Sequence, residues 1–178
     1  MAKNRLSYTV VDSPVGELVL ASSPKGLAAV LLPGKGKPLD RLRKRFSDSD
    51  IDEDLEPNRN AVEQIRGYFS GERKTFDLLL DMRGTPFQLR VLKAVSKVPY
   101  GKTRSYGNIA RTVGKPKAFR AVGNTNRTNP IPIVIPCHRI VGSDGSLTGY
   151  GGGIPLKAAL LRLERSFIYP RLCMHNRG

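Results

Sequence analysis

Cysteine and histidine are scarce in this sequence, which holds two residues of each type. They form two separate groups, Cys137 with His138 and Cys173 with His175. A structural zinc site takes four ligands at regular spacing, and two such groups, one of them near the C-terminus, do not provide that pattern. Two cysteines in a chain without a secretion signal also argue against a disulfide framework. We therefore expect no bound metal and no structural disulfide.

Long apolar runs are also absent from the sequence. No stretch approaches the roughly 18 apolar residues that a membrane-spanning helix requires. The first ten residues, MAKNRLSYTV, are polar and lack the apolar centre of a signal peptide. We therefore expect a cytoplasmic protein that does not enter a membrane.

Acidic residues are rare in the second half of the chain. Residues 85–178 contain 16 Lys and Arg but only 2 acids, Asp144 and Glu164, which gives a net charge of +14. Residues 1–84 are almost neutral, with 14 basic and 13 acidic residues. A solvated basic surface is the simplest reading, but self-repulsion makes so large an excess costly unless a polyanion neutralises it. The asymmetry predicts nucleic-acid binding by the second half.

The first half has the patterns of a small α+β domain, which we expect to span residues 1–84 and to end in a linker. Short alternating apolar runs between turn residues predict three antiparallel strands at 6–13, 16–23 and 26–33. Apolar residues at helical spacing predict helices within 37–47 and within 58–73, the second ending at Gly71. Two further segments are expected to be an acidic solvated loop, 47–57, and one more strand, 74–82.

The second half has helical patterns, and we expect residues 85–178 to form one DNA-binding domain. Thr85 followed by Pro86 is a typical helix start. Two short helices follow, one from about Ser105 to Gly114 and one within 117–130, and a last helix is expected over 155–164. Two short helices joined by a glycine-containing turn fit a helix-turn-helix motif, although many helical hairpins have the same pattern. The charge asymmetry favours the DNA-binding alternative.

The stretch PIPIVIPCHRIV, residues 130–141, places Cys137 and His138 side by side after an apolar run. A buried free cysteine most often serves as a small apolar residue. A reactive cysteine must lose its proton and needs a base, and the base needs an orienting group. His138 is the candidate base and Glu164, the only glutamate of the basic half, the candidate orienter. Adjacent side chains in extended backbone point in opposite directions, so we expect a bridging water rather than a direct bond.

The quoted stretch, with SYGNIARTVGKPKAFRAVGNTNRTNP before it and LTGYGGG and KAALLRLE after it, resembles the O6-alkylguanine-DNA alkyltransferases. The resemblance covers roughly residues 87–164. It implies a repair protein that flips an alkylated guanine out of the duplex and moves the alkyl group from O6 to a cysteine, irreversibly and once per molecule. It also implies a monomer that needs no cofactor and binds double-stranded DNA in the minor groove with little sequence preference.

The resemblance assigns roles to individual residues. Cys137 matches the alkyl acceptor, His138 its water-bridged base and Glu164 the carboxylate that orients the histidine. Asn129 matches a side chain that braces the turn before the cysteine, and Tyr106 one that rotates the nucleotide and contacts the flipped guanine. The expected DNA contacts are Arg120, which fills the gap in the base stack, with Tyr106, Arg127, Ala121, Gly123 and Lys117. The expected substrate pocket consists of Pro132, Tyr150, Gly151 and Val141.

The chain also departs from the family pattern. Gly151 stands where some relatives carry a serine, so only its backbone N–H is available to the guanine O6. Some relatives bind zinc in the first domain through cysteine and histidine, and this half has neither residue. Three alternative functions stay open: a lesion-sensing protein with an unreactive cysteine, a helix-turn-helix regulator and a Cys–His hydrolase. The first binds alkylated DNA without transfer, the second prefers one DNA sequence, and the basic surface disfavours the third.

Overall fold

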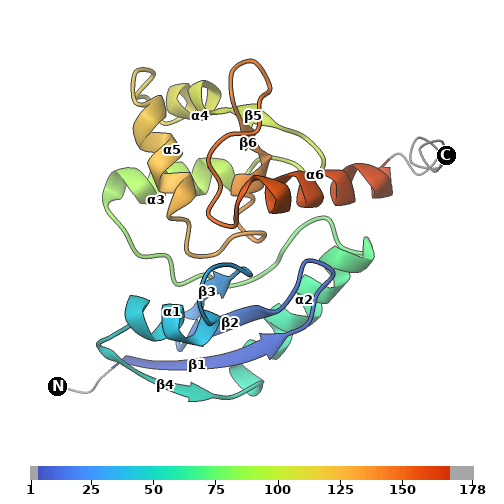
Figure 1. Ribbon diagram of the computed structural model, residues 1–178. Coiled ribbons are helices and arrows are strands. Elements are labelled where there is room, and N and C mark those ends of the chain that lie inside the picture. The colour runs from blue at the N-terminus through green and yellow to red at the C-terminus, as the bar shows by residue number, and fades with distance from the viewer. Residues whose placement is uncertain (1–3, 169–178) are drawn as a thin grey trace. The chain divides into compact units, whose positions relative to one another are not determined.

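The computed structural model describes residues 4–168, which fold into two compact units (Figure 1). The first unit contains the chain up to Gly84 together with the segment Pro130–Val134. The second unit contains Thr85–Asn129 and the chain from Ile135 onwards. A linear division at residue 84 therefore misses one short segment, which returns to the first unit. Cys173 and the tail 169–178 lie outside the described residues.

A four-stranded sheet forms the centre of the first unit, in the order β3-β2-β1-β4. Its strands are β1 (Asn4–Val11), β2 (Leu18–Ser23), β3 (Gly26–Leu31) and β4 (Ser49–Glu53). β1 pairs antiparallel with β2, with Thr9 opposite Leu20, and β2 pairs antiparallel with β3, with Leu20 opposite Val30. The expectation of an α+β fold with three antiparallel strands first is confirmed. The sheet is mixed, because β4 adds a parallel pairing to β1.

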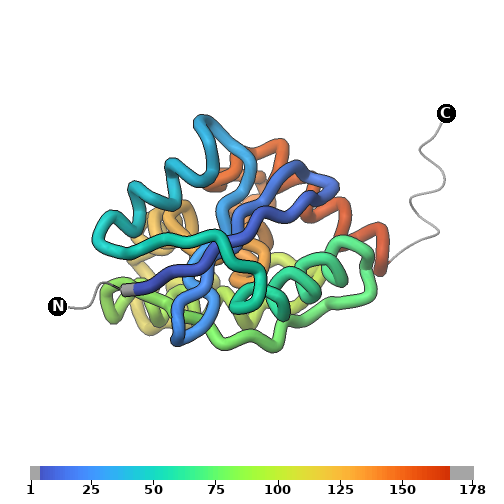
Figure 2. Tube along the Cα trace, turned by 90° about the horizontal axis from the view of Figure 1, so that it is seen from below, coloured from blue at the N-terminus to red at the C-terminus, as the bar shows by residue number. Residues whose placement is uncertain are grey.

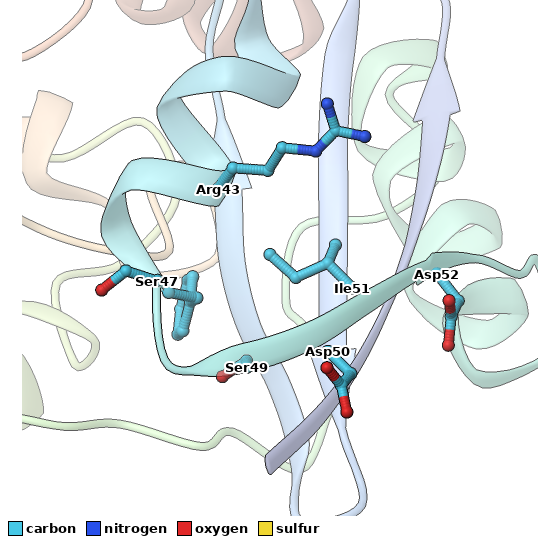
Figure 3. A pocket seen from close by; sticks show the side chains of 7 residues that line it. Arg43, Ser47, Ser49, Asp50, Ile51 and Asp52 are labelled. Atoms are coloured by element: carbon cyan, nitrogen blue, oxygen red, sulfur yellow. The ribbon is translucent and has the colours of Figure 1, made fainter. Parts of the chain in front are cut away.

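Strand β4 corrects the expectation of a solvated loop at 47–57. Its sequence, SDIDE, has one apolar residue, so the apolar alternation that indicates a strand is missing. Ile51 packs against the core, whereas Asp50 and Asp52 are exposed. Figure 3 shows Ile51 directed towards helix α1 and Arg43, with the two aspartates directed away from them. The strand alternates as the pleat requires, but acidic residues occupy its outer face.

The strand expected at 74–82 is reduced to one bridge. Leu80 pairs with Leu27 of β3, and the backbone of the segment exchanges two hydrogen bonds of 2.9 Å with Leu27. Gly26 permits this approach, since a Cβ atom there would lie 2.3 Å from the carbonyl oxygen of Leu79. The apolar residues of the segment do not extend the sheet, and the side chain of Leu79 is exposed.

Two helices pack on the first unit's sheet, α1 (Pro38–Arg45) and α2 (Arg59–Ser70), with a 3₁₀ turn at Glu56–Asn58. Leu42 of α1 is fully buried against strand residues that include Leu6 and Val19. Gly71 ends α2 in the left-handed conformation, with φ of 82°, as its place after the apolar stripe predicted. Figures 1 and 2 show α1 and α2 at opposite ends of the sheet.

The second unit is mainly helical. Its helices are α3 (Pro86–Val95), α4 (Tyr106–Thr112), α5 (Phe119–Arg127) and α6 (Ile154–Ile168), and its short elements are β5 (Arg104–Ser105), β6 (Ile140–Val141) and a 3₁₀ turn at Cys137–Arg139. Thr85 caps α3 through a reciprocal capping box with Gln88, which confirms the predicted start. The last helix extends four residues beyond the expected end at Glu164.

Helices α4 and α5 form the predicted helix-turn-helix. Ser105 caps α4 through a second capping box, with Asn108. Gly114 follows α4 with φ of 72°, a backbone conformation that glycine adopts without strain. Val122, on the inner face of α5, is fully buried, and both helices contact α3. Arg120 and Arg127, on the outer side of α5, are exposed.

Candidate active site

The 3₁₀ turn holds Cys137 inside the second unit. Pro136 precedes it, and the amide of Arg139 donates to the carbonyl of Pro136 at 2.9 Å. The turn leads directly into β6, where Ile140 pairs with Arg104 of β5. The cysteine side chain is only 3% exposed. The apolar run seen in the sequence thus delivers a thiol to the interior of this unit.

Asn129 connects the end of α5 to this turn. Its Nδ2 atom donates to the carbonyl of Ile135 at 2.8 Å and lies 3.1 Å from Cys137 Sγ. One buried amide therefore contacts both the backbone before the cysteine and its sulfur. Among the residues assigned by resemblance, Asn129 and Cys137 lie in direct contact.

His138, Arg139 and Glu164 form a buried polar network. The Nε2 atom of His138 lies 2.7 Å from Glu164 Oε1, and an Arg139 guanidinium nitrogen lies 2.9 Å from the same oxygen. Glu164 Oε2 also accepts from the backbone amide of Gly101 at 2.7 Å. The structure thus pairs the predicted histidine with the predicted carboxylate, 26 residues apart in the chain. Arg139 was not predicted from the sequence.

The network determines the charge of its members. Burial by itself would raise the pKa of Glu164, but the hydrogen bonds and charges of His138 and Arg139 outweigh it and lower that pKa to about 2. Burial lowers the pKa of His138, and Glu164 only partly opposes this. At neutral pH the carboxylate is therefore ionised and the imidazole neutral. The Nδ1 atom of His138 is buried and has no hydrogen-bond partner among the described residues.

The thiol of Cys137 is protonated in this environment. Burial raises its pKa to about 11, although the hydrogen bond from Asn129 and the charge of Lys157 act in the opposite direction. Because only the thiolate is a strong nucleophile, reaction requires that a base remove the proton. His138, the next residue, is a neutral imidazole and is able to accept it.

Lys157 is a second residue that sequence reasoning missed. Its side chain is fully buried, and its Nζ atom donates to the carbonyls of Ile140 and Thr148, the latter at 2.7 Å. Burial lowers its pKa to about 8, and the charge of Cys137 raises it. The signal was present in the sequence: Lys157 and Glu164 lie two turns apart on the buried face of α6, beside Leu160 and Leu161.

Tyr106, the first residue of α4, contacts the glycine-rich loop that follows β6. Its hydroxyl donates to the carbonyl of Thr148 at 2.9 Å and lies 3.2 Å from that of Gly149. Its ring lies over Gly123 of α5, where an added Cβ would be 3.8 Å from two ring carbons. A cleft of about 360 Å³ opens beside it, lined by Tyr106, Phe119, Gly123, Asn124, Arg127, Thr148 and Gly149.

The remaining predicted residues fall into two groups. Ala121 and Lys117 are exposed, as are Arg120 and Arg127, on or just before α5. Val141 and Tyr150 are buried, and the Tyr150 hydroxyl has no hydrogen-bond partner in the described part of the chain. The other two expected pocket residues are Gly151, which is exposed, and Pro132, which is buried in the segment that belongs to the first unit.

Residues 4–168 contain neither a candidate metal site nor a candidate membrane span. No group of three or more His, Cys, Asp or Glu side chains in that range is placed to hold a metal ion. In the same range, no helix combines the length and the apolar character needed to cross a bilayer.

Comparison with known families agrees with the site. The model of the 6-O-methylguanine DNA methyltransferase DNA binding domain matches residues 86–166, and that of the ribonuclease-like domain of the same proteins matches residues 6–82. A methylated-DNA–protein-cysteine methyltransferase of Mycobacterium tuberculosis is 46% identical over 172 residues, covering 90% of this chain and 93% of the relative. One of Methanosarcina barkeri is 46% identical over 162 residues, covering 89% and 97%.

Solved structures give the same result. The Mycobacterium tuberculosis OGT in complex with DNA has a TM-score of 0.80 and 44% identity, covering 92% of this chain and 94% of that one. The O6-methylguanine-DNA methyltransferase of Pyrococcus kodakaraensis has a TM-score of 0.65 and 25% identity, covering 89% and 98%. The family expected from the resemblance is confirmed, and the chain belongs to the 6-O-methylguanine DNA methyltransferases.

Proposed function

We propose that this protein repairs DNA by moving an alkyl group from O6 of guanine to Cys137, once per molecule. The observation that carries the proposal is the surroundings of the buried Cys137 thiol. Asn129 Nδ2 lies 3.1 Å from its sulfur, and the next residue, His138, is paired with Glu164. In this proposal the second unit, Thr85–Asn129 with the chain from Ile135 onwards, is the DNA-binding and alkyl-acceptor part of the protein. Its free cysteine stays reduced in the cytoplasm, where we place the protein.

The transfer begins with the loss of the thiol proton. His138 accepts it at Nδ1 through a bridging water, and Glu164 stabilises the imidazolium that forms. Two observations support this step. His138 Nδ1 is buried and has no hydrogen-bond partner among the described residues, and His138 Nε2 lies 2.7 Å from the carboxylate of Glu164. Lys157 and Asn129 both lower the pKa of Cys137, and they stabilise the thiolate in the same step.

The thiolate then attacks the alkyl carbon. The S–C bond forms, the C–O6 bond breaks, and its electron pair leaves with guanine, which takes up the proton that His138 removed. A thioether remains on Cys137, and nothing in this reaction removes it. Every atom and electron is supplied by the protein and the lesion, so no cofactor takes part.

The lesion must leave the duplex to reach a buried sulfur. Flipping a nucleotide costs a few kcal/mol, which contacts with the DNA must offset. We assign this work to α4 and α5, with Arg120 of α5 filling the gap in the base stack from the minor groove and Tyr106 of α4 guiding the nucleotide. In this proposal the Tyr106 hydroxyl gives up its hydrogen bonds to the carbonyls of Thr148 and Gly149 and donates to the guanine instead. The exposed basic residues of the unit supply phosphate contacts with little sequence preference.

The test is the intact mass of the protein after it is mixed with duplex DNA containing one O6-methylguanine, followed by peptide mapping. We expect one added methyl group per molecule, on Cys137, and none in Cys137→Ser, which still binds the DNA. Cys173→Ser is the matched control and keeps the transfer. An unchanged wild-type mass with intact binding would identify a lesion sensor instead, and preference for one undamaged sequence would identify a regulator.

A further inference from the structure

An exposed aromatic residue begins the helix that carries Arg120. Phe119 is the first residue of α5, and its side chain is 49% exposed. The guanidinium carbon of Arg120 lies 5.8 Å from the centre of its ring. A single exposed aromatic residue is common on protein surfaces, so its neighbours decide whether it is placed to contact a ligand.

Phe119 belongs to the cleft that Tyr106 lines. Residues four apart lie on the same face of a helix, so Phe119, Gly123 and Arg127 form one stripe along α5. All three line the cleft of about 360 Å³. Gly123 has no side chain, and the ring of Tyr106 lies over it. The stripe therefore presents an aromatic ring at one end and an arginine at the other, with the ring of Tyr106 beside Gly123 between them.

The composition of the cleft favours a nucleobase as its occupant. Its walls carry two aromatic rings, and Arg127 and the adjacent Arg120 supply positive charge, with no acidic side chain among the lining residues. Aromatic rings beside positive charge are the combination with which proteins hold unstacked bases next to their phosphates. Insertion of an apolar side chain between base steps is likewise typical of proteins that bend DNA from the minor groove.

We propose that Phe119 is a stacking residue, whose ring packs on a base exposed when the alkylated nucleotide leaves the duplex. This rests on the proposed function and adds a second insertion residue beside Arg120. Phe119 stabilises the opened DNA and does not take part in alkyl transfer. It therefore acts on duplex substrates and has no effect on a free base that diffuses to Cys137.

The test compares transfer rates on two substrates. For Phe119→Ala we expect a rate about tenfold or more below wild type on duplex DNA with one O6-methylguanine. On free O6-benzylguanine the rate stays unchanged. Phe119→Tyr retains the ring and the wild-type rate, whereas Phe119→Leu, which is apolar but not aromatic, is as slow as the alanine variant. Phe167→Ala removes an exposed aromatic residue of α6 and serves as the matched control, with both rates unchanged.

A second measurement does not depend on transfer. In a Cys137→Ser background, 2-aminopurine placed opposite cytosine reports flipping by a rise in fluorescence, and Phe119→Ala should reduce that rise at saturating protein. Because the substitution removes no charge, the dependence of binding on salt should keep its slope. Equal loss on both substrates, no loss on either, full rescue by leucine or an unchanged fluorescence rise would each overturn the proposal. If wild-type protein transfers nothing, the proposed function fails, and the fluorescence alone decides the role of Phe119.

Discussion

His138 and Glu164 are joined by a 2.7 Å contact between Nε2 and Oε1, and both side chains are completely buried. The pair links the residue after the cysteine to the last helix. Because Glu164 raises the pKa of His138 against the effect of burial, the carboxylate makes the imidazole a better base. The same carboxylate balances the charge of Arg139, so it has a structural role as well.

Glu164→Gln should separate these two roles. Loss of the carboxylate lowers the pKa of His138 further, and we expect transfer to fall about 100-fold on both duplex DNA and a free base, as loss of general-base assistance does. It also leaves Arg139 buried without a charge partner, which costs roughly 3–5 kcal/mol of unfolding free energy. Stopped-flow transfer rates and urea unfolding measure the two effects. A stable variant with an unchanged rate would contradict the base assignment.

The pH dependence of stability gives an independent check on the same pair. The pKa of Glu164 is lower in the folded protein, about 2 against 4.5, so its contribution is complete above about 4.5 and is lost as the pH falls towards about 2. The pKa of His138 is also lowered, so stability decreases as the pH falls below its ordinary value of 6.5. Urea unfolding from pH 7 to pH 3 should show both losses in wild type. Glu164→Gln should show a smaller loss at the acidic end, where Asp81, whose pKa the hydrogen bond from Arg83 also lowers, still contributes.

Lys157→Met should slow transfer without affecting DNA binding. Its charge lowers the pKa of Cys137, and each unit by which that pKa rises in the variant costs about tenfold in thiolate at neutral pH. The rate should fall equally on duplex DNA and free base and recover at alkaline pH. Lys93→Met, which removes an exposed lysine of α3, is the control and keeps the wild-type profile. If the transfer rate of Lys157→Met did not recover at high pH, Lys157 would act through packing alone.

The buried charge of Lys157 also predicts how stability varies in alkali. The pKa of Lys157 is about 8 in the folded protein, against the ordinary lysine value of 10.5 that applies to the unfolded chain. Between pH 8 and pH 10.5 the unfolded chain therefore binds more protons than the folded protein. Stability should therefore rise with pH in that window. Thermal unfolding from pH 7.5 to pH 10 should show the rise in wild type and its absence in Lys157→Met. Groups that do not interact with Lys157 cancel when the two curves are subtracted, and a Cys137→Ser background in both proteins removes the thiol that does interact with it.

Two buried asparagines near the end of α5 should respond in opposite ways to the same substitution. Asn129 donates to the carbonyl of Ile135, whereas both amide atoms of Asn126 lack a hydrogen-bond partner among residues 4–168. Leucine has the same number of heavy atoms as asparagine. We expect Asn129→Leu to cost about 1–3 kcal/mol and Asn126→Leu to gain about 1 kcal/mol in unfolding free energy. Loss in both variants would mean that Asn126 has a partner in solution.

Much of the site was predictable because short patterns specify it. The cap at Thr85 and the start of a helix near Ser105 follow from local patterns, and the structure contains both. Glu164 was predicted as the histidine's partner because the basic half has no other glutamate. The composition of this half was therefore enough to predict the partner without knowledge of the fold. His138 and Glu164 are in contact although they lie 26 residues apart in the sequence.

The missed features depend on tertiary contacts. Arg139 resembles a surface residue in a basic chain, and the sequence places Lys157 on the apolar face of α6 without indicating its partners. The contacts with Glu164 and with the loop carbonyls explain their burial. Strand β4 forms because β1 offers a free edge, although its own sequence is acidic. Segment 74–82 is apolar enough for a strand, but Leu80 forms its single bridge with β3. Whether such a segment forms a strand depends on the neighbouring strand available for pairing more than on its own residue propensities.

Arg120→Ala should reveal whether this residue assists flipping or only binds phosphate. Its side chain is exposed, and the contact recorded for its charge is with the ring of Phe119. If it fills the gap in the base stack, the variant loses a contact that offsets flipping, and transfer on duplex DNA should fall about 10- to 100-fold. Transfer from a free base should stay at the wild-type rate, because that substrate needs no flipping.

Lys117→Ala is the matched control for charge, three residues earlier and also exposed. A lysine that contacts phosphate contributes about one unit to the slope of binding against salt, and its loss weakens binding to all duplexes alike. Arg120→Ala should instead bind an undamaged duplex nearly as well as Lys117→Ala does, yet transfer far more slowly at saturating protein. Saturation removes the difference in affinity, so any rate difference that remains belongs to the step after binding. Equal rates at saturation would reduce Arg120 to one phosphate contact among several.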